Sequence, residues 1–142
     1  MQTSEQSVFS EAEQAALAAI VGQIIPASQE FDVPGADDPE ILADILISGA
    51  HLRDRLAVAL AEVDLEARDR AAMAAEFRKA FAQEAELIQI LTAQCYYRDA
   101  RVMRALKLDV RPPFPVGYVQ EPSDFSLLDP VIQRGEIYRK VP

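Results

Sequence analysis

The stretch 66–108 constrains the fold most, because it is rich in Ala, Glu, Arg, Gln and Leu and its apolar residues recur at helical spacing. Two successive apolar seams are visible, the first formed by Met73, Phe77 and Phe81 and the second by Leu87, Ile88, Leu91 and Cys95, and they are followed by Val102, Met103 and Leu106. A helical pattern of this length without caps is typical of two or three helices. We expect breaks near Ala82 and Arg98.

The N-terminal third predicts two further helices. Ser10 and Glu13 form a capping box, in which each side chain can bond the other residue's backbone amide, and Pro26 ends this helix. Residues 26–38 then read as a loop with exposed Phe31 and Val33. Asp38 is the expected cap of a second helix, with proline at its first position. Its apolar pattern runs to about residue 63 and includes Val58, with a possible kink at 48–49, and Asp64 is a plausible cap for the helix that follows.

The C-terminal part changes character at residue 109. Three prolines within 112–115 exclude helix and central strand there and favour an extended, irregular arm. A short helical turn is predicted over 124–134, where Leu127, Leu128, Val131 and Ile132 offer an apolar face and Gly135 follows. The predicted class is therefore all-α: one domain, 1–142, with a tail at 1–9, a compact core of four to six helices at 10–108 and a proline-rich arm at 109–142.

Charge limits the partners of this chain. Residues 1–66 carry 13 acidic and two basic side chains, a net −11, whereas residues 67–142 carry a net +2, which together give the chain's −9. An acidic surface repels phosphate backbones, so nucleic acid is a poor partner. No window approaches the length of about 18 apolar residues that a membrane span needs. The N-terminus shows no secretory or twin-arginine signal, so we expect a soluble, cytoplasmic protein.

Catalytic and metal sites are not predicted. His51 is the single histidine, without the spacing of a metal motif, and Cys95, the single cysteine, lies on an apolar stripe where a buried hydrophobe is expected rather than a nucleophile. No glycine motif for nucleotide phosphates occurs. We interpret the acidic side chains as a solvent-exposed surface and not as a convergent catalytic pair. We expect no catalytic, cofactor-binding or metal-binding residue in this chain.

Two features favour contact with another protein. Arg98, Arg101, Arg104 and Lys107 are spaced along one predicted helix face, either as ordinary solvated cations or as a contact for an acidic partner. Aromatic residues in the stiff arm supply contact area of the kind found at interfaces, unless the arm wraps its own helices. The predicted partner-binding residues are Tyr96, Tyr97, Arg98, Arg101, Arg111, Pro113, Phe114, Pro115, Tyr118 and Phe125.

Short segments of the chain resemble the gluconate 2-dehydrogenase subunit 3 family, the small subunits of flavin-dependent dehydrogenases of the glucose-methanol-choline type. The similar segments are 9–11 through 24–26, 33–36, Tyr96-Tyr97 with 102–106, and the proline-rich 111–118. The resemblance implies an accessory subunit that helps the flavoprotein fold, stay soluble or be exported, with FAD and the sugar chemistry in the large subunit. The absence of a twin-arginine signal departs from the family, which argues against an export role and favours a cytoplasmic complex or a relative whose task has changed.

The predicted function is thus a non-catalytic small subunit of a flavin-dependent sugar or alcohol dehydrogenase. Two alternatives remain open. One is a self-associating helical module, which would form a homo-oligomer. The other is a small stand-alone enzyme with a pocket among Tyr96, Tyr97 and Arg98, although no activated base is evident there.

Overall fold

The computed structural model describes residues 8–108, 110 and 124–135. Within these residues the chain forms seven α helices and two 3₁₀ helices, and the only β pairing is an isolated bridge between Ser28 and Val33. The predicted all-α class is confirmed. The chain divides into two units, 1–110 and 111–142. We call the described part of the first the helical body and residues 124–135 the C-terminal segment.

Helix α1 (Glu11–Ile24) begins as the sequence predicts. The Glu13 amide donates to the Ser10 hydroxyl, and the Ser10 amide donates to the Glu13 carboxylate at 2.7 Å. Arg53 adds an ion pair to the same carboxylate at 2.9 Å, which ties the start of α1 to the third helix. Leu17 and Val21 are completely buried in the centre of the body. The capping box therefore both starts the helix and anchors it.

The second predicted helix is divided at residue 49. Helix α2 (Pro39–Ser48) ends there, a 3₁₀ turn η1 (Ala50–Leu52) follows, and α3 (Arg53–Ala61) continues. A Cβ on Gly49 would lie 2.6 Å from the Leu91 Cδ2 atom and 2.9 Å from the Ile45 carbonyl oxygen, so only glycine lets α2 approach α5 this closely. The predicted inward position of Val58 is wrong, because its side chain is exposed on α3.

The stretch 66–108 contains three helices: α4 (Arg70–Ala80), α5 (Ala82–Tyr96) and α6 (Ala100–Ala105). The breaks near Ala82 and Arg98 are confirmed. The predicted start was too early, because Asp64 closes a turn by accepting the Glu66 amide and the cap of α4 is Asp69, which accepts the Ala72 amide. Leu106 is exposed beyond α6 instead of continuing the apolar seam.

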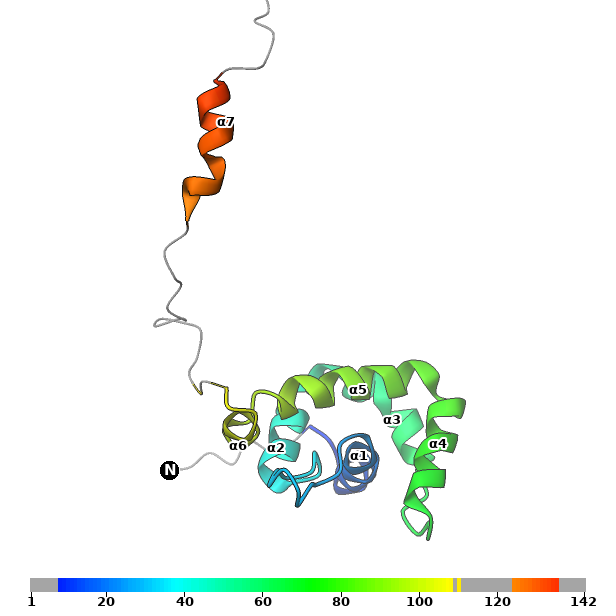
Figure 1. Ribbon diagram of the computed structural model, residues 1–142. Helices are drawn as coiled ribbons and strands as arrows, with labels where there is room; N and C mark the ends of the chain where they lie inside the picture. Colours follow the sequence, from blue (N-terminus) through cyan, green and yellow to red (C-terminus); the bar gives the residue numbers. More distant parts are fainter. Residues whose placement is uncertain (1–7, 109, 111–123, 136–142) are drawn as a thin grey trace, which may run out of the picture. The chain divides into compact units, whose positions relative to one another are not determined.

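The core lies around α1. Figure 1 shows α5 crossing over α1, with α4 at one end of the body and α6 at the other. Helix α1 packs against α3, α4 and α5, and α2 packs along α5. The completely buried side chains of Leu17, Ile41, Ile45, Leu56 and Ile88 meet in this core. Val102 is the buried residue that α6 contributes to the core, so the attachment of α6 to the body depends more on polar contacts than on apolar packing.

The C-terminal segment consists of a 3₁₀ helix, η2 (Phe125–Leu128), that continues into α7 (Asp129–Arg134). Asp124 accepts the Ser126 amide at 2.9 Å, and Gly135 ends the helix with a φ of 70°. The predicted turn over 124–134 is confirmed. All twelve described residues of this segment are exposed.

Helices able to cross a membrane are not found among the described residues, because none combines sufficient length with sufficient apolar character.

Candidate functional site

The predicted partner-binding residues fall in three places. Tyr96, Tyr97, Arg98 and Arg101 come together where α5 ends and α6 begins, and we call residues 96–101 the α5–α6 junction. Phe125 lies in the C-terminal segment. The other five predicted residues, Arg111, Pro113, Phe114, Pro115 and Tyr118, lie outside the described residues.

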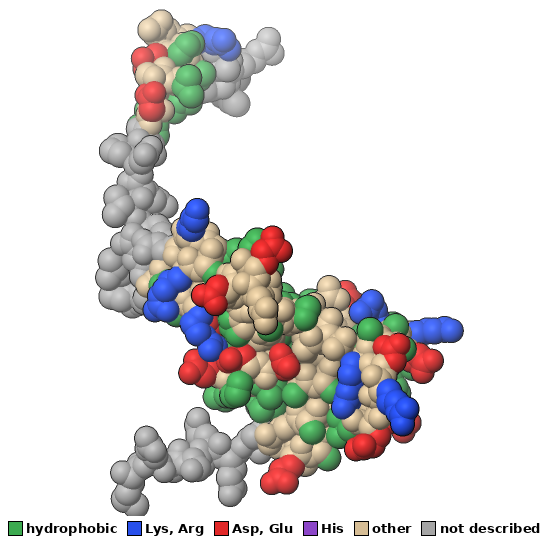
Figure 2. Space-filling view, turned by 60° about the horizontal axis from the view of Figure 1, so that its bottom comes forward, with side chains coloured by type: hydrophobic (Ala, Val, Ile, Leu, Met, Phe, Trp, Pro, Cys, Tyr) green, Lys and Arg blue, Asp and Glu red, His purple; other side chains and the backbone are tan. Residues whose placement is uncertain are grey.

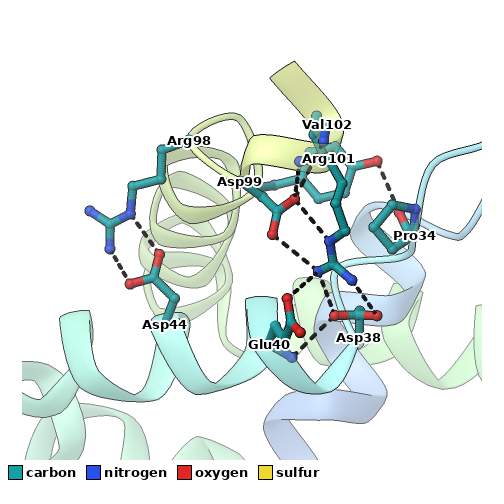
Figure 3. Close-up of polar contacts among 9 residues, drawn as sticks. Pro34, Asp38, Glu40, Asp44, Arg98, Asp99, Arg101 and Val102 are labelled. Atoms are coloured by element: carbon teal, nitrogen blue, oxygen red, sulfur yellow. Dashed lines mark hydrogen bonds and ion pairs between the residues drawn. The ribbon is translucent and has the colours of Figure 1, made fainter. Parts of the chain in front are cut away.

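Arg101 connects the junction to the start of α2. Its Nη2 atom lies 2.7 Å from Asp38 Oδ1, 3.0 Å from Asp99 Oδ2 and 3.5 Å from Glu40 Oε2 (Figure 3). Hydrogen bonds from Arg101 lower the pKa of both Asp38 and Asp99 below the usual value, against the opposing effect of burial. The same interactions raise the pKa of the guanidinium. One cation thus holds two helix starts together.

Arg98 makes a second contact between α2 and the junction. It donates to both Asp44 oxygens, at 2.6 and 2.5 Å (Figure 3). It also donates to the Ser48 hydroxyl at 2.5 Å. Such two-point pairing of a guanidinium with a carboxylate fixes orientation as well as distance. Sequence reasoning missed this contact, because Asp44 precedes Arg98 by 54 positions and no local pattern links them.

Cys95 lies next to this pair, with its Sγ atom 3.6 Å from Arg98 Nη2. The thiol is buried, and burial raises its pKa, so the thiol form is favoured over the nucleophilic thiolate. This environment suits the small hydrophobe that the sequence predicts.

The two tyrosines have opposite environments. Tyr96 is 4% exposed and its hydroxyl donates to the Pro34 carbonyl at 3.0 Å, whereas Tyr97 is 55% exposed. Their rings meet edge to face, with centroids 5.4 Å apart. Burial raises the pKa of Tyr96, which keeps its hydroxyl protonated as a hydrogen-bond donor. Tyr96 therefore fastens the junction to the loop before α2, and Tyr97 is the tyrosine available for contact.

The predicted cationic stripe on one helix face is wrong in its geometry. Helix α6 starts only at Ala100, so Arg98 precedes it, and Lys107 follows its end in a left-handed conformation with a φ of 59°. Arg98 and Arg101 bind carboxylates of this chain. Arg104 and Lys107 are exposed and form no ion pair or side-chain hydrogen bond within the described part of the chain.

A groove of about 740 Å³ lies between the 26–34 loop and α6. Phe31 lines it and is 67% exposed, and Arg101 and Arg104 line it from α6. The loop presents Phe31 on a closed turn, in which Ser28 and Val33 exchange two backbone hydrogen bonds at 3.1 Å and Asp32 has a φ of 51°. Although Phe31 and Arg104 are each noticeable in the sequence, nothing there indicates that they share a groove. Figure 2 shows basic side chains at both ends of the body, mixed at each end with acidic ones.

His51 is exposed in η1, and the described residues contain no group of three or more His, Cys, Asp or Glu side chains suited to a metal ion. Within residues 8–108, the polar groups of the junction mainly hold helices together. What they can offer chemically is a rigid, charged contact surface beside an exposed aromatic residue.

The C-terminal segment carries a second apolar surface. Phe125, Leu127, Leu128, Val131 and Ile132 are 49–83% exposed in a helix of ten residues, and Figure 2 shows green side chains on this piece. Within its own unit, the segment buries none of its described residues.

No protein-family model matches the chain, and no curated protein or solved structure is significantly similar to it. The family resemblance of the segments within 9–118 therefore stays a prediction.

Proposed function

We propose that this chain is a non-catalytic small subunit of a flavin-dependent sugar or alcohol dehydrogenase complex of the glucose-methanol-choline type. It binds the large subunit, which holds FAD and performs the chemistry, and supports the folding or stability of that subunit. The class of partner is taken from the resemblance of residues 9–118 to the gluconate 2-dehydrogenase subunit 3 family. The binding role itself has a separate, physical support.

The observation that carries the binding role is the exposed apolar face of the C-terminal segment. Its helix has a side-chain cap at Asp124 and a glycine stop at Gly135, yet it leaves Leu127 83% exposed. An isolated helix of this length is marginal in water. Amphipathic helices of this kind gain stability by laying their apolar residues in a groove of another protein.

The proposal includes the finer architecture. Helices α1 to α6 act as a compact bundle that presents the α5–α6 junction, and residues 109–142 act as a proline-rich arm that reaches the partner. In the arm, Arg111, Pro113, Phe114, Pro115 and Tyr118 contact the large subunit together with Phe125. Prolines reduce the entropy that an extended segment loses on binding.

A self-associating module is the second candidate, because the same exposed face could be covered by another copy of this chain. It predicts a stable homo-oligomer in the absence of any other protein. The two candidates therefore differ in what accompanies the purified chain.

Affinity purification from the native cells tests the proposal. We expect a yellow flavoprotein to co-purify with the wild-type chain. The double variant Leu128→Ser with Ile132→Ser should lower the amount of co-purified flavoprotein about tenfold, because two central apolar contacts are lost. Ile47→Ser with Val58→Ser is the matched control, since both side chains are 66–72% exposed on the helical body. Phe114→Ala with Tyr118→Ala tests the rest of the arm in the same assay.

A chain that purifies without a flavoprotein would contradict the proposal, as would a flavoprotein retained equally by all variants. Light scattering on the purified chain separates the second candidate. A dimer that Leu128→Ser with Ile132→Ser dissociates would support self-association instead.

A further inference from the structure

The groove between the 26–34 loop and α6 offers an exposed aromatic ring on a braced support. Phe31 is 67% exposed, and its backbone amide donates to the Ser28 hydroxyl within the closed turn. The opposite wall is braced as well, because Tyr96 bonds the Pro34 carbonyl and Arg101 bonds Asp38. An exposed aromatic side chain on a preorganised frame loses little conformational entropy when a partner covers it.

The charge of the groove comes mainly from α6. Arg101 is already surrounded by Asp38, Asp99 and Glu40 and has little charge left to offer. Arg104 lines the groove with no acid bound to it in the described part of the chain, and Lys107 follows two residues after the last turn of α6. Asp32 is the single carboxylate among the described residues that line the groove. The exposed cations Arg104 and Lys107 thus lie on the α6 side of the groove, whereas the exposed acids Glu30 and Asp32 lie on the loop side.

We infer that this groove binds an acidic segment of the partner protein, with an apolar side chain against Phe31 and a carboxylate on Arg104. The inference rests on the proposed function for the existence of a partner and adds the chemistry of the segment that is recognised. On the α6 wall an acidic group is favoured over a basic one, because a basic group would meet Arg104, which has no ion pair within the described residues. The acidic remainder of the chain disfavours a polyanion the size of a nucleic acid.

Two short peptides of equal length test the charge preference on the full chain. One contains Glu, Leu and Gly, and the other has Lys in place of every Glu. By fluorescence anisotropy at low salt, we expect the Glu peptide to bind at least about tenfold more tightly than the Lys peptide, and added salt to weaken it.

Variants locate the binding. Arg104→Glu and Phe31→Ser should each weaken the Glu peptide about tenfold, because one reverses the free cation and the other removes the anchor. Arg78→Glu is the matched control, since Arg78 is an exposed cation on α4 that does not line the groove, and it should leave binding unchanged. Arg104→Ala and circular dichroism provide a check if Arg104→Glu disturbs folding.

Equal binding of the two peptides overturns the inference, and so does binding that Phe31→Ser and Arg104→Glu leave intact. A homodimer that Phe31→Ser dissociates also overturns it, because a second copy would then occupy the groove. Failure of the proposed function is recognised separately. If no flavoprotein co-purifies while the Glu peptide binds as described, the groove inference stands and the dehydrogenase assignment fails.

Discussion

The Arg101 guanidinium lies between two carboxylates that also accept hydrogen bonds from backbone amides. Asp38 accepts the Glu40 amide at 3.1 Å, and Asp99 accepts the amides of Arg101 and Val102 at 2.8 and 3.3 Å. Each aspartate thus caps a helix and binds the same guanidinium. Because the folded state lowers the pKa of both, their contribution to stability is complete above the unfolded pKa of about 4 and is lost as the pH falls through the lowered folded values.

Replacing Arg101 with Met should lower the free energy of unfolding by about 1–2 kcal/mol at neutral pH, between the effects seen for exposed and for buried pairs. It should also flatten the loss of stability below pH 5, because the two aspartates would then titrate closer to their ordinary pKa. Chemical denaturation across a pH series measures both effects.

Arg104→Met is the control for that variant, because it makes the same substitution one turn later at an exposed residue. It should change stability by less than about 0.5 kcal/mol. Equal effects of the two substitutions would show that the Arg101 contacts contribute nothing specific.

Lys107 adopts a backbone conformation that glycine normally provides. Its amide donates to the Arg104 carbonyl, and the Leu108 amide donates to the Met103 carbonyl, which is the usual hydrogen-bond pair of a helix that ends in a left-handed residue. With a φ of 59°, a side chain at this position is strained by about 1 kcal/mol.

Lys107→Gly should therefore stabilise the protein by about 0.5–1 kcal/mol, which thermal unfolding would show as a higher Tm. Lys79→Gly makes the same change inside the last turn of α4, where glycine lowers helix stability, and should lower the Tm. A fall in Tm for Lys107→Gly would contradict the strain argument.

At the scale of elements, the approach of α2 to α5 depends on Gly49. Its φ of −87° is open to any residue, so the requirement is one of space and not of backbone conformation. Gly49→Ala should destabilise the fold by about 1–3 kcal/mol, because a Cβ would press on Leu91 and on the Ile45 carbonyl. Urea denaturation measures this loss.

Gly22→Ala is the matched substitution in α1. Its Cβ would lie 3.1 Å from the exposed Asp37 side chain, which can move away, so the higher helix propensity of alanine should dominate and stabilise the protein by about 0.5–1 kcal/mol. Similar effects of the two substitutions would mean that the contact with α5 is not tight.

The helix starts were predictable from the sequence where one capping signal stood alone. The capping box at Ser10 and the Asp38-Pro39 pair located α1 and α2 correctly, because caps act over three or four residues. The start of α4 was missed, since Asp64 and Asp69 carry the same local signal and only the fold decides between a turn and a cap.

The contacts of the candidate site were not predictable in this way. Asp38 and Arg101 are 63 positions apart, and Phe31 and Arg104 line one groove only because the 26–34 loop and α6 are neighbours in the fold. A sequence pattern reveals which residues share a helix face, but it does not reveal with which distant carboxylate a guanidinium forms an ion pair. The stripe from Arg98 to Lys107 was misread for this reason, because two of its cations are used within the chain.

At the scale of the whole molecule, the two units should differ greatly in local stability. Helix α5 runs through the core, with Ile88 completely buried, whereas the C-terminal segment buries none of its described residues. Amides of residues 125–134 should therefore exchange with solvent orders of magnitude faster than those of 85–95 in the isolated chain.

Hydrogen exchange followed by mass spectrometry measures this difference, and a co-purified partner supplies the comparison. We expect residues 125–134 to become protected in the complex while the α5 amides stay as they are. Protection of the C-terminal segment in the isolated monomer would mean that it is already covered, which would remove the physical support for a binding role.

The double use of Asp38 and Asp99 has an evolutionary consequence. A substitution at either position removes a cap and an ion pair together, whereas loss of Arg101 leaves two acidic groups facing each other. Positions 38, 99 and 101 should therefore change as a set among descendants of a common ancestor, and a homologue without the arginine should also have lost an aspartate.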